Sequence, residues 1–271
     1  MWVEFVTELT LYHFDLLEAS MRNNIIPTID LSSFFNEVNE DGKKKVMDII
    51  SHACSEYGFF QIVNHGMPLS LMTRALEVSK MFFEYPVEEK LKFKSNPPPD
   101  APLPSGYSGQ PQHSVDKSEY LLMYPPGSSI NVFPDQPAEL RKVMEDIFSD
   151  FSKAALLIET ILNDCLGLPS KFLQEYNNDR RWDIMAVFRY LPGAIDKEDN
   201  NIGLTEHQDA NWITFVLQDE IGGLEVLKNG IWIPIVPTEG SLIVNVGDVI
   251  QVRQGHLSTG RYWVLGVVVC I

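Results

Sequence analysis

The last part of the chain restricts the fold most, because from Asp183 onward it breaks into short apolar segments separated by turn residues. Turn residues cluster at Glu220–Gly223, Lys228–Gly230 and Pro237–Gly240, which leaves little room for helices between them. Many short strands at close spacing predict a β-sandwich or jelly roll. The expected strands are Ile184–Tyr190, Leu204–Asp209, Trp212–Gln218, Leu224–Leu227, Trp232–Val236 and Ser241–Val246.

The preceding part has a mainly helical pattern. Between Gln136 and Leu166 apolar residues recur at three- and four-residue spacing, with Asp135 as a candidate N-cap and Gly167 directly after the end. Shorter expected elements are a helix at Lys43–Tyr57, a buried strand at Phe59–Val63 and a helix at Leu71–Phe83. With 271 residues, 45% of them hydrophobic, the chain can bury a sizeable core. The patterns together predict an α+β fold, with a helical region before an all-β region.

Composition excludes some partners. The chain has 21 Lys and Arg against 37 Asp and Glu, a formal net charge of −16, which argues against a nucleic-acid or anionic-membrane surface. The chain has an odd number of cysteines, Cys54, Cys165 and Cys270, and they are widely spaced, as expected of reduced thiols. We find no signal-peptide pattern and no stretch long enough to cross a bilayer. We expect a cytoplasmic monomer that binds neither membranes nor nucleic acid.

His207 and Asp209 stand two residues apart in the expected strand Leu204–Asp209. In a strand such residues point to the same face, so the imidazole and the carboxylate can reach one ion. A neutral imidazole nitrogen with a hard carboxylate oxygen suits iron(II), as in the two-His-one-carboxylate facial triad. The competing interpretation is a solvated pair on a polar strand face, which is common.

Further segments extend this signal. In chain order they are Ile26–Leu31, Ala53–Gly66, Phe82–Pro86, Gly106-Tyr107, Gly203–Asp219, Gly222–Val226, Gly230–Trp232 and Asn245–Asp248. In these residues, and in their order, the chain resembles the plant-type 2-oxoglutarate/iron(II)-dependent dioxygenase family from about Ile26 to Gln251. The resemblance implies a double-stranded β-helix (jelly roll) core, with an extension at 1–20, a mostly helical region at 21–182 and the jelly roll at 183–271.

The resemblance also implies a chemistry. His207 and Asp209 would bind Fe(II), and 2-oxoglutarate would chelate the metal through its 2-oxo group and one carboxylate oxygen. With O2, and with ascorbate as an optional further cofactor, the family hydroxylates, demethylates or desaturates a small organic metabolite, here one of plant specialised metabolism. No catalytic residue beyond the metal ligands is implied.

Three features depart from the family pattern. In the strand that normally holds the keto acid, Tyr190 stands at the family's Tyr position, whereas Phe188 replaces its Asn. The family's distal His follows the Gly-Asp pair by about fifteen residues and completes the triad. That position is Trp263 here, so His256 is a candidate third ligand, with an ordinary loop histidine as the alternative. The Arg-x-Ser pair that clamps 2-oxoglutarate lies beyond the last residue.

The tail from residue 253 is atypical, so we expect the last core strands to be missing or replaced. Residues 261–271 are apolar and β-prone, and predict either an added edge strand or an exposed aggregation-prone segment. Tyr107, Tyr120 and Phe215 are candidate substrate-pocket residues, with core packing as the alternative for Phe215.

We therefore expect a non-haem iron(II) 2-oxoglutarate-dependent dioxygenase. Two alternatives stay open. One is an inactive truncated isoform that acts as a binding or regulatory protein, and the other is an oxidase of the same fold that does not use 2-oxoglutarate. The sequence does not identify the substrate, because specificity comes from loops and pocket shape.

Overall fold

The computed structural model of the chain describes residues 26–36, 38–94, 101–110, 114, 116–176, 178–191, 203–250 and 263–271. The strands are β1 (Thr28–Asp30), β2 (Phe59–Val63), β3 (Gly106–Gly109), β4 (Ser118–Met123), β5 (Ile184–Tyr190), β6 (Asn211–Gln218), β7 (Glu225–Lys228), β8 (Ile231–Pro234), β9 (Leu242–Val246) and β10 (Trp263–Cys270). An eight-stranded mixed sheet runs in the order β1-β2-β9-β6-β10-β5-β4-β3, and β7 pairs with β8 in a second, two-stranded sheet.

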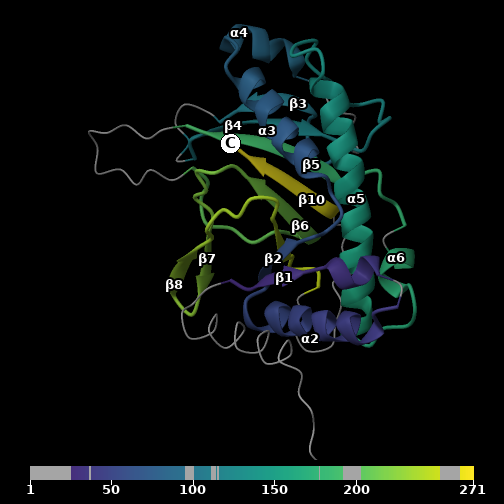
Figure 1. Cartoon of the computed structure of the whole chain (residues 1–271). Helices are drawn as coiled ribbons and strands as arrows, with labels where there is room; N and C mark the ends of the chain where they lie inside the picture. The colour runs from purple at the N-terminus through teal and green to yellow at the C-terminus, as the bar shows by residue number, and fades with distance from the viewer. Residues whose placement is uncertain are drawn as a thin grey trace, which may run out of the picture.

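The helices cover one face of the large sheet. They are α2 (Glu40–Glu56), α3 (Leu69–Phe83), α4 (Val87–Lys90), α5 (Leu140–Cys165) and α6 (Phe172–Tyr176), with 3-10 turns η1 (Ser32–Phe35) and η2 (Leu91–Phe93). Helix α5 follows the apolar stripe of the sequence, and the side chains of Leu140, Ile147, Phe151 and Ile158 are fully buried. The long α5 and the shorter α3 lie along the sheet, while the β7–β8 hairpin stands apart from them (Figure 1).

Strand β6 shows how the two faces of the sheet differ. Phe215 points to the helices and packs on Phe151 of α5, with ring centroids 5.9 Å apart. Val216, the next residue, points the other way and packs in a smaller cluster with Val226 of the hairpin. Because side chains alternate along a strand, Thr214 shares the hairpin-side face with Val216. This face carries the candidate site.

The tail enters the centre of the sheet. Strand β10 lies between β6 and β5 and is parallel to both, with Val268 opposite Val216 on one side and Ala186 on the other. Val267 and Val269 are buried against the helices. The expectation of an edge strand is therefore wrong. A central strand forms backbone hydrogen bonds along both edges and buries apolar side chains, so it is stabilised more than a strand at the edge of the sheet. The sequence left open whether the last core strands are missing or replaced, and β10 occupies a central position of the sheet.

One other expectation needs correction. Residues 203–210 form no strand, although Leu204–Asp209 was predicted as one, and most of this segment is exposed. All helices of the described residues precede residue 183, and β1 to β4 from the same region join the large sheet. In the described part of the chain, no helix has the length and apolar character to cross a membrane.

Candidate metal centre

His207 and Asp209 lie side by side in the segment that leads into β6. Nε2 of His207 is 3.4 Å from Oδ1 of Asp209. The predicted meeting of the two side chains thus occurs, but it comes from an irregular segment and not from a strand face. The side chain of His207 is 54% exposed and that of Asp209 is 26% exposed, so the pair opens to solvent.

A backbone contact orients the His207 ring. Nδ1 lies 2.9 Å from the carbonyl oxygen of Thr205, and an Nδ1–H donor there leaves Nε2 facing Asp209. Thr205 is itself held, since its backbone N–H donates to Asp116 at 2.7 Å. A metal-binding histidine typically donates its second ring N–H to such an acceptor. The hydrogen bond with Asp209 raises the pKa of His207 to about 9.

The Asp209 carboxylate is held by one of its two oxygens. Oδ2 accepts hydrogen bonds from the Thr214 hydroxyl at 2.5 Å and from Nδ2 of Asn245 at 2.9 Å. Burial works to raise the pKa of Asp209, but hydrogen bonds from His207, Thr214 and Asn245 outweigh it and lower the pKa. The group is therefore an ionised carboxylate with Oδ1 directed at His207.

The turn after β9 forms hydrogen bonds with the backbone of the segment that carries His207 and Asp209. The N–H of Asp248 donates to the carbonyl of Asp209, and the N–H of Gly247 donates to that of Trp212, each at 2.9 Å. A Cβ on Gly247 would stand 2.1 Å from the backbone oxygen of Asn211, so no larger residue fits without a backbone shift. Asn245–Asp248 and the His207–Asp209 segment thus form one structural unit.

The donor set fits an iron(II) ion as far as it is described. An imidazole nitrogen and a carboxylate oxygen converge from one side, and both are ligand types that iron(II) accepts. Among the described residues no third His, Cys, Asp or Glu joins them to complete a metal-binding group. His256, the candidate third ligand, lies outside the described residues.

The structure places Tyr190 at the last position of β5. The Tyr190 ring stacks on the Phe188 ring with centroids 5.9 Å apart. A Cβ on Gly203 would stand 2.5 Å from the Tyr190 ring. Burial raises the pKa of Tyr190, and so does a hydrogen bond with the Cys270 thiol of β10. The predicted keto-acid residue is therefore in contact with the atypical tail.

The three candidate pocket residues lie in different surroundings. Tyr107 is 4% exposed, and its hydroxyl donates to Glu119 at 2.5 Å. Phe215 is fully buried on the helix-facing side, which is the core position left open as its alternative. Tyr120 is half-buried, 5.4 Å from the Phe188 ring, and lies in the same cross-strand row as Cys270 and Gln218. Only Tyr120 of the three shares the face of Thr214.

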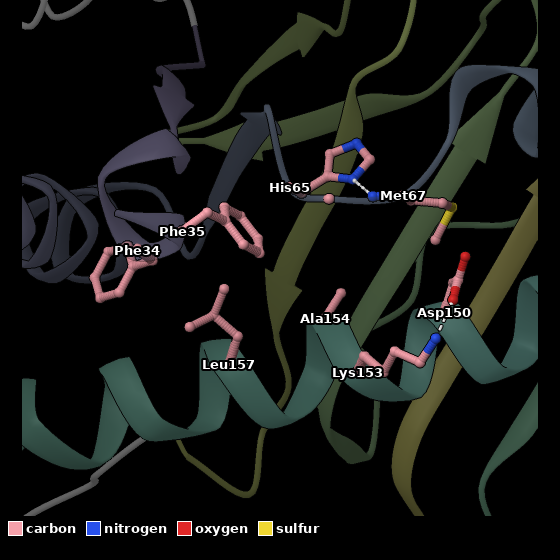
Figure 2. Close-up of a pocket in the computed structure, with 9 residues that line it drawn as sticks. Phe34, Phe35, His65, Met67, Asp150, Lys153, Ala154 and Leu157 are labelled. Carbon is pink, nitrogen blue, oxygen red and sulfur yellow. Dashed lines mark hydrogen bonds and ion pairs between the residues drawn. The ribbon is translucent and has the colours of Figure 1, made fainter. Parts of the chain in front are cut away.

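A hollow of about 240 Å³ opens on the helix side (Figure 2). It is formed by η1, the turn after β2 and α5, with the lining residues Phe34, Phe35, His65, Gly66, Met67, Asp150, Lys153, Ala154 and Leu157. Its lining is largely apolar. Both ring nitrogens of His65 are occupied, by the Gly240 carbonyl at 3.0 Å and the Met67 N–H at 3.3 Å. His65 is thus held in a structural position, and the hollow includes neither His207 nor Asp209.

Sequence reasoning missed the roles of Thr214 and Asn245. Both lay inside segments that carried the family resemblance, but neither was assigned a contact. One signal was present, because Asn is depleted in strands and Asn245 sits within an otherwise apolar run. Such a residue on a buried strand needs a polar partner, which here is Asp209.

Comparison with known proteins identifies relatives for most of the chain. Residues 26–142 match the family model of the non-haem dioxygenase in morphine synthesis N-terminal region, and residues 182–262 match that of the 2OG-Fe(II) oxygenase superfamily. Flavanone 3-dioxygenase 2 of Oryza sativa subsp. japonica is 29% identical over 92% of this chain and 69% of the relative. Jasmonate-induced oxygenase 1 of Arabidopsis thaliana is 34% identical over 88% of this chain and 58% of the relative.

Solved structures of similar proteins support the same family and fold. JOX2 in complex with 2OG, Fe and JA is 30% identical with a TM-score of 0.69, covering 83% of this chain and 65% of that one. The dioxygenase for auxin oxidation 1 from Arabidopsis thaliana, solved with 2-oxoglutarate, is 26% identical with a TM-score of 0.62, covering 83% and 80%. The predicted jelly-roll fold is thereby confirmed. The chain spans 58% to 69% of the length of the two curated relatives above.

Proposed function

The chain belongs to the plant-type 2-oxoglutarate/iron(II)-dependent dioxygenase family, and from this premise we propose that the protein oxidises a small organic molecule. It would use Fe(II), 2-oxoglutarate and O2. The observation that carries this proposal is the Asp209 carboxylate, which has Oδ2 anchored and Oδ1 facing Nε2 of His207 at 3.4 Å. Such an arrangement leaves two donor atoms of suitable chemistry for one ion.

Each residue of the site has a separate task. His207 and Asp209 would hold the metal, which when bound with the keto acid and O2 supplies the oxidising chemistry. Thr205 fixes the imidazole ring through its carbonyl oxygen, and Asp116 fixes Thr205. Because a metal ion competes with the proton on His207, binding would release that proton.

Tyr190 is our proposed contact to the keto acid. The Cys270 thiol that acts on the pKa of Tyr190 is a weak hydrogen-bonding group, whereas a carboxylate is a strong acceptor. A bound carboxylate would therefore replace the thiol at small cost. We expect Tyr190→Phe to weaken 2-oxoglutarate binding without changing metal affinity.

The substrate class follows from the same face of the sheet. Flavanone 3-dioxygenase 2 is named for a flavanone, and the JOX2 structure holds JA together with 2OG and Fe. In this chain the rings of Tyr120 and Phe188 lie 5.4 Å apart on the face that carries Thr214. We propose that the substrate is a small, largely apolar plant metabolite.

The three cysteines are free thiols, which supports a cytoplasmic location.

An anaerobic titration with Fe(II), followed by 2-oxoglutarate, tests the function. We expect the visible charge-transfer band of a metal-chelated keto acid, and we expect it to vanish in His207→Ala. The matched control is His52→Ala on α2, which should keep the band. If the folded parent protein gives no band, the dioxygenase proposal fails, and the chain is better described as a non-catalytic binding protein.

A further inference from the structure

Two strand residues hold the oxygen of Asp209 that faces away from His207. Thr214 and Asn245 donate to Oδ2, while Oδ1 lies 3.4 Å from Nε2 of His207. We propose that Thr214 and Asn245 are positioning residues, which keep the carboxylate turned so that Oδ1 is presented to the metal. This inference rests on the proposed function, because it assigns the orientation of one of the two ligands.

The direction of the hydrogen bonds supports this role. Nδ2 of Asn211 donates to the Thr214 hydroxyl oxygen at 2.8 Å. A hydroxyl has a single proton, so an oxygen that accepts from Asn211 has its own proton free to donate to Asp209. Asn245 donates through its amide nitrogen. Both hydrogen-bond partners of Oδ2 among the described residues are thus donors, and rotation of Oδ2 toward the metal would break both bonds.

The two anchors stand on strands of the large sheet, whereas the ligands lie on a segment outside it. Thr214 and Asn245 are directly opposite each other in the β6–β9 ladder and are 4% and 6% exposed. Opposed residues of an antiparallel pair have Cβ atoms about 4.5–5.5 Å apart, so their separation is set by the sheet. His207 and Asp209 lie on the irregular, mostly exposed segment 203–210. The backbone of this segment is held by Asp248, and the two anchors add a fixed orientation for the Asp209 side chain that the sheet sets.

The affinity for Mn(II), measured by electron paramagnetic resonance, tests the proposal without turnover. Thr214→Val and Asn245→Leu remove the donors at similar volume, and we expect each to weaken Mn(II) binding by about 10- to 100-fold. Thr214→Ser keeps the hydroxyl and should stay within about threefold of the parent. Thr160→Val on the exposed side of α5 is the matched control. The unfolding midpoint of every variant is measured beside its affinity, because a merely structural loss would lower the midpoint alone.

Crystal structures of the metal-free parent and variants give a second readout. We expect the contact of Oδ1 with Nε2 to be kept in the parent and in Thr214→Ser, and lost by rotation of the carboxylate in Thr214→Val and Asn245→Leu. Unchanged affinity together with an unrotated carboxylate would overturn the proposal. If the parent binds no Mn(II), the proposed function falls and the rotation alone decides the positioning role. If Asn245→Leu does not fold, the Thr214→Val and Thr214→Ser pair decides.

Discussion

Glu119 shows how a single residue can organise a buried polar cluster. Its carboxylate accepts from Nζ of Lys90 at 2.6 Å, from the Tyr107 hydroxyl at 2.5 Å and from Arg189 at 3.2 Å. Lys90 is only 3% exposed and also donates to the carbonyl of Phe83. Removal of one partner of a buried ion pair leaves the other charge without compensation, which costs more than the pair contributes. The cluster therefore ties α4, β3, β4 and β5 together.

Substitutions in this cluster should affect stability. We expect Glu119→Ala to lower the free energy of unfolding by about 3–5 kcal/mol, since Lys90 keeps a buried charge. Tyr107→Phe removes one hydrogen bond and should cost about 1 kcal/mol. Chemical denaturation measures both, with Glu220→Ala as the exposed control. A Tyr107→Phe protein of parental stability but weaker substrate binding would instead return Tyr107 to the substrate pocket.

At the scale of elements, periodicity located most of the structure. Phe59–Val63 and Ile184–Tyr190 were predicted with the bounds observed, because apolar runs of that length between turn residues have few other solutions. β3 and β4 were missed, since Gly106–Gly109 has two glycines and Ser118–Met123 lacks alternation. Periodicity describes one segment at a time, so it could not show that β10 would enter the sheet between β6 and β5.

The same limit applies to the candidate site. The spacing of His207 and Asp209 predicted that their side chains lie close together, although it placed them on a strand that the structure does not have. Thr214 and Asn245 meet Asp209 only through the pairing of β6 with β9, which no local pattern encodes. The sequence thus brought forward His207 and Asp209 as candidate ligands and gave no sign that Thr214 and Asn245 bond to Asp209.

The burial of β10 gives a prediction at this scale. Val269 is fully buried against the helices, and Val236 is 70% exposed in the loop after β8. Truncation of a buried side chain loses its transfer free energy and leaves a cavity, so we expect Val269→Ala to lower the free energy of unfolding by about 2 kcal/mol. Val236→Ala is the matched control and should change it by less than about 0.5 kcal/mol. Equal effects in urea unfolding would show that β10 is not packed in the core.

Across the whole molecule, the large sheet interleaves distant parts of the chain. β2 pairs with β9, and β10 separates β5 from β6, so the order in space has little relation to the order in sequence. The main core likewise includes residues of η1, α2, α3, α5 and the central strands. A molecule built this way has few boundaries along which one part can unfold alone, because non-local pairings must form together.

Deletion of residues 263–271 tests this interdependence. Without β10, the strands β5 and β6 would lose the neighbour that pairs with both, and their backbone groups would face each other across an empty strand position. We expect the shortened chain to lose cooperative thermal unfolding and to bind a hydrophobic dye, with helical circular dichroism partly retained. The matched control replaces Val236 and Ile221, both exposed, with serine in the full chain and should unfold as the parent does. A shortened chain with parental cooperativity would mean that β5 and β6 close on each other, and that the tail is a dispensable part of the fold.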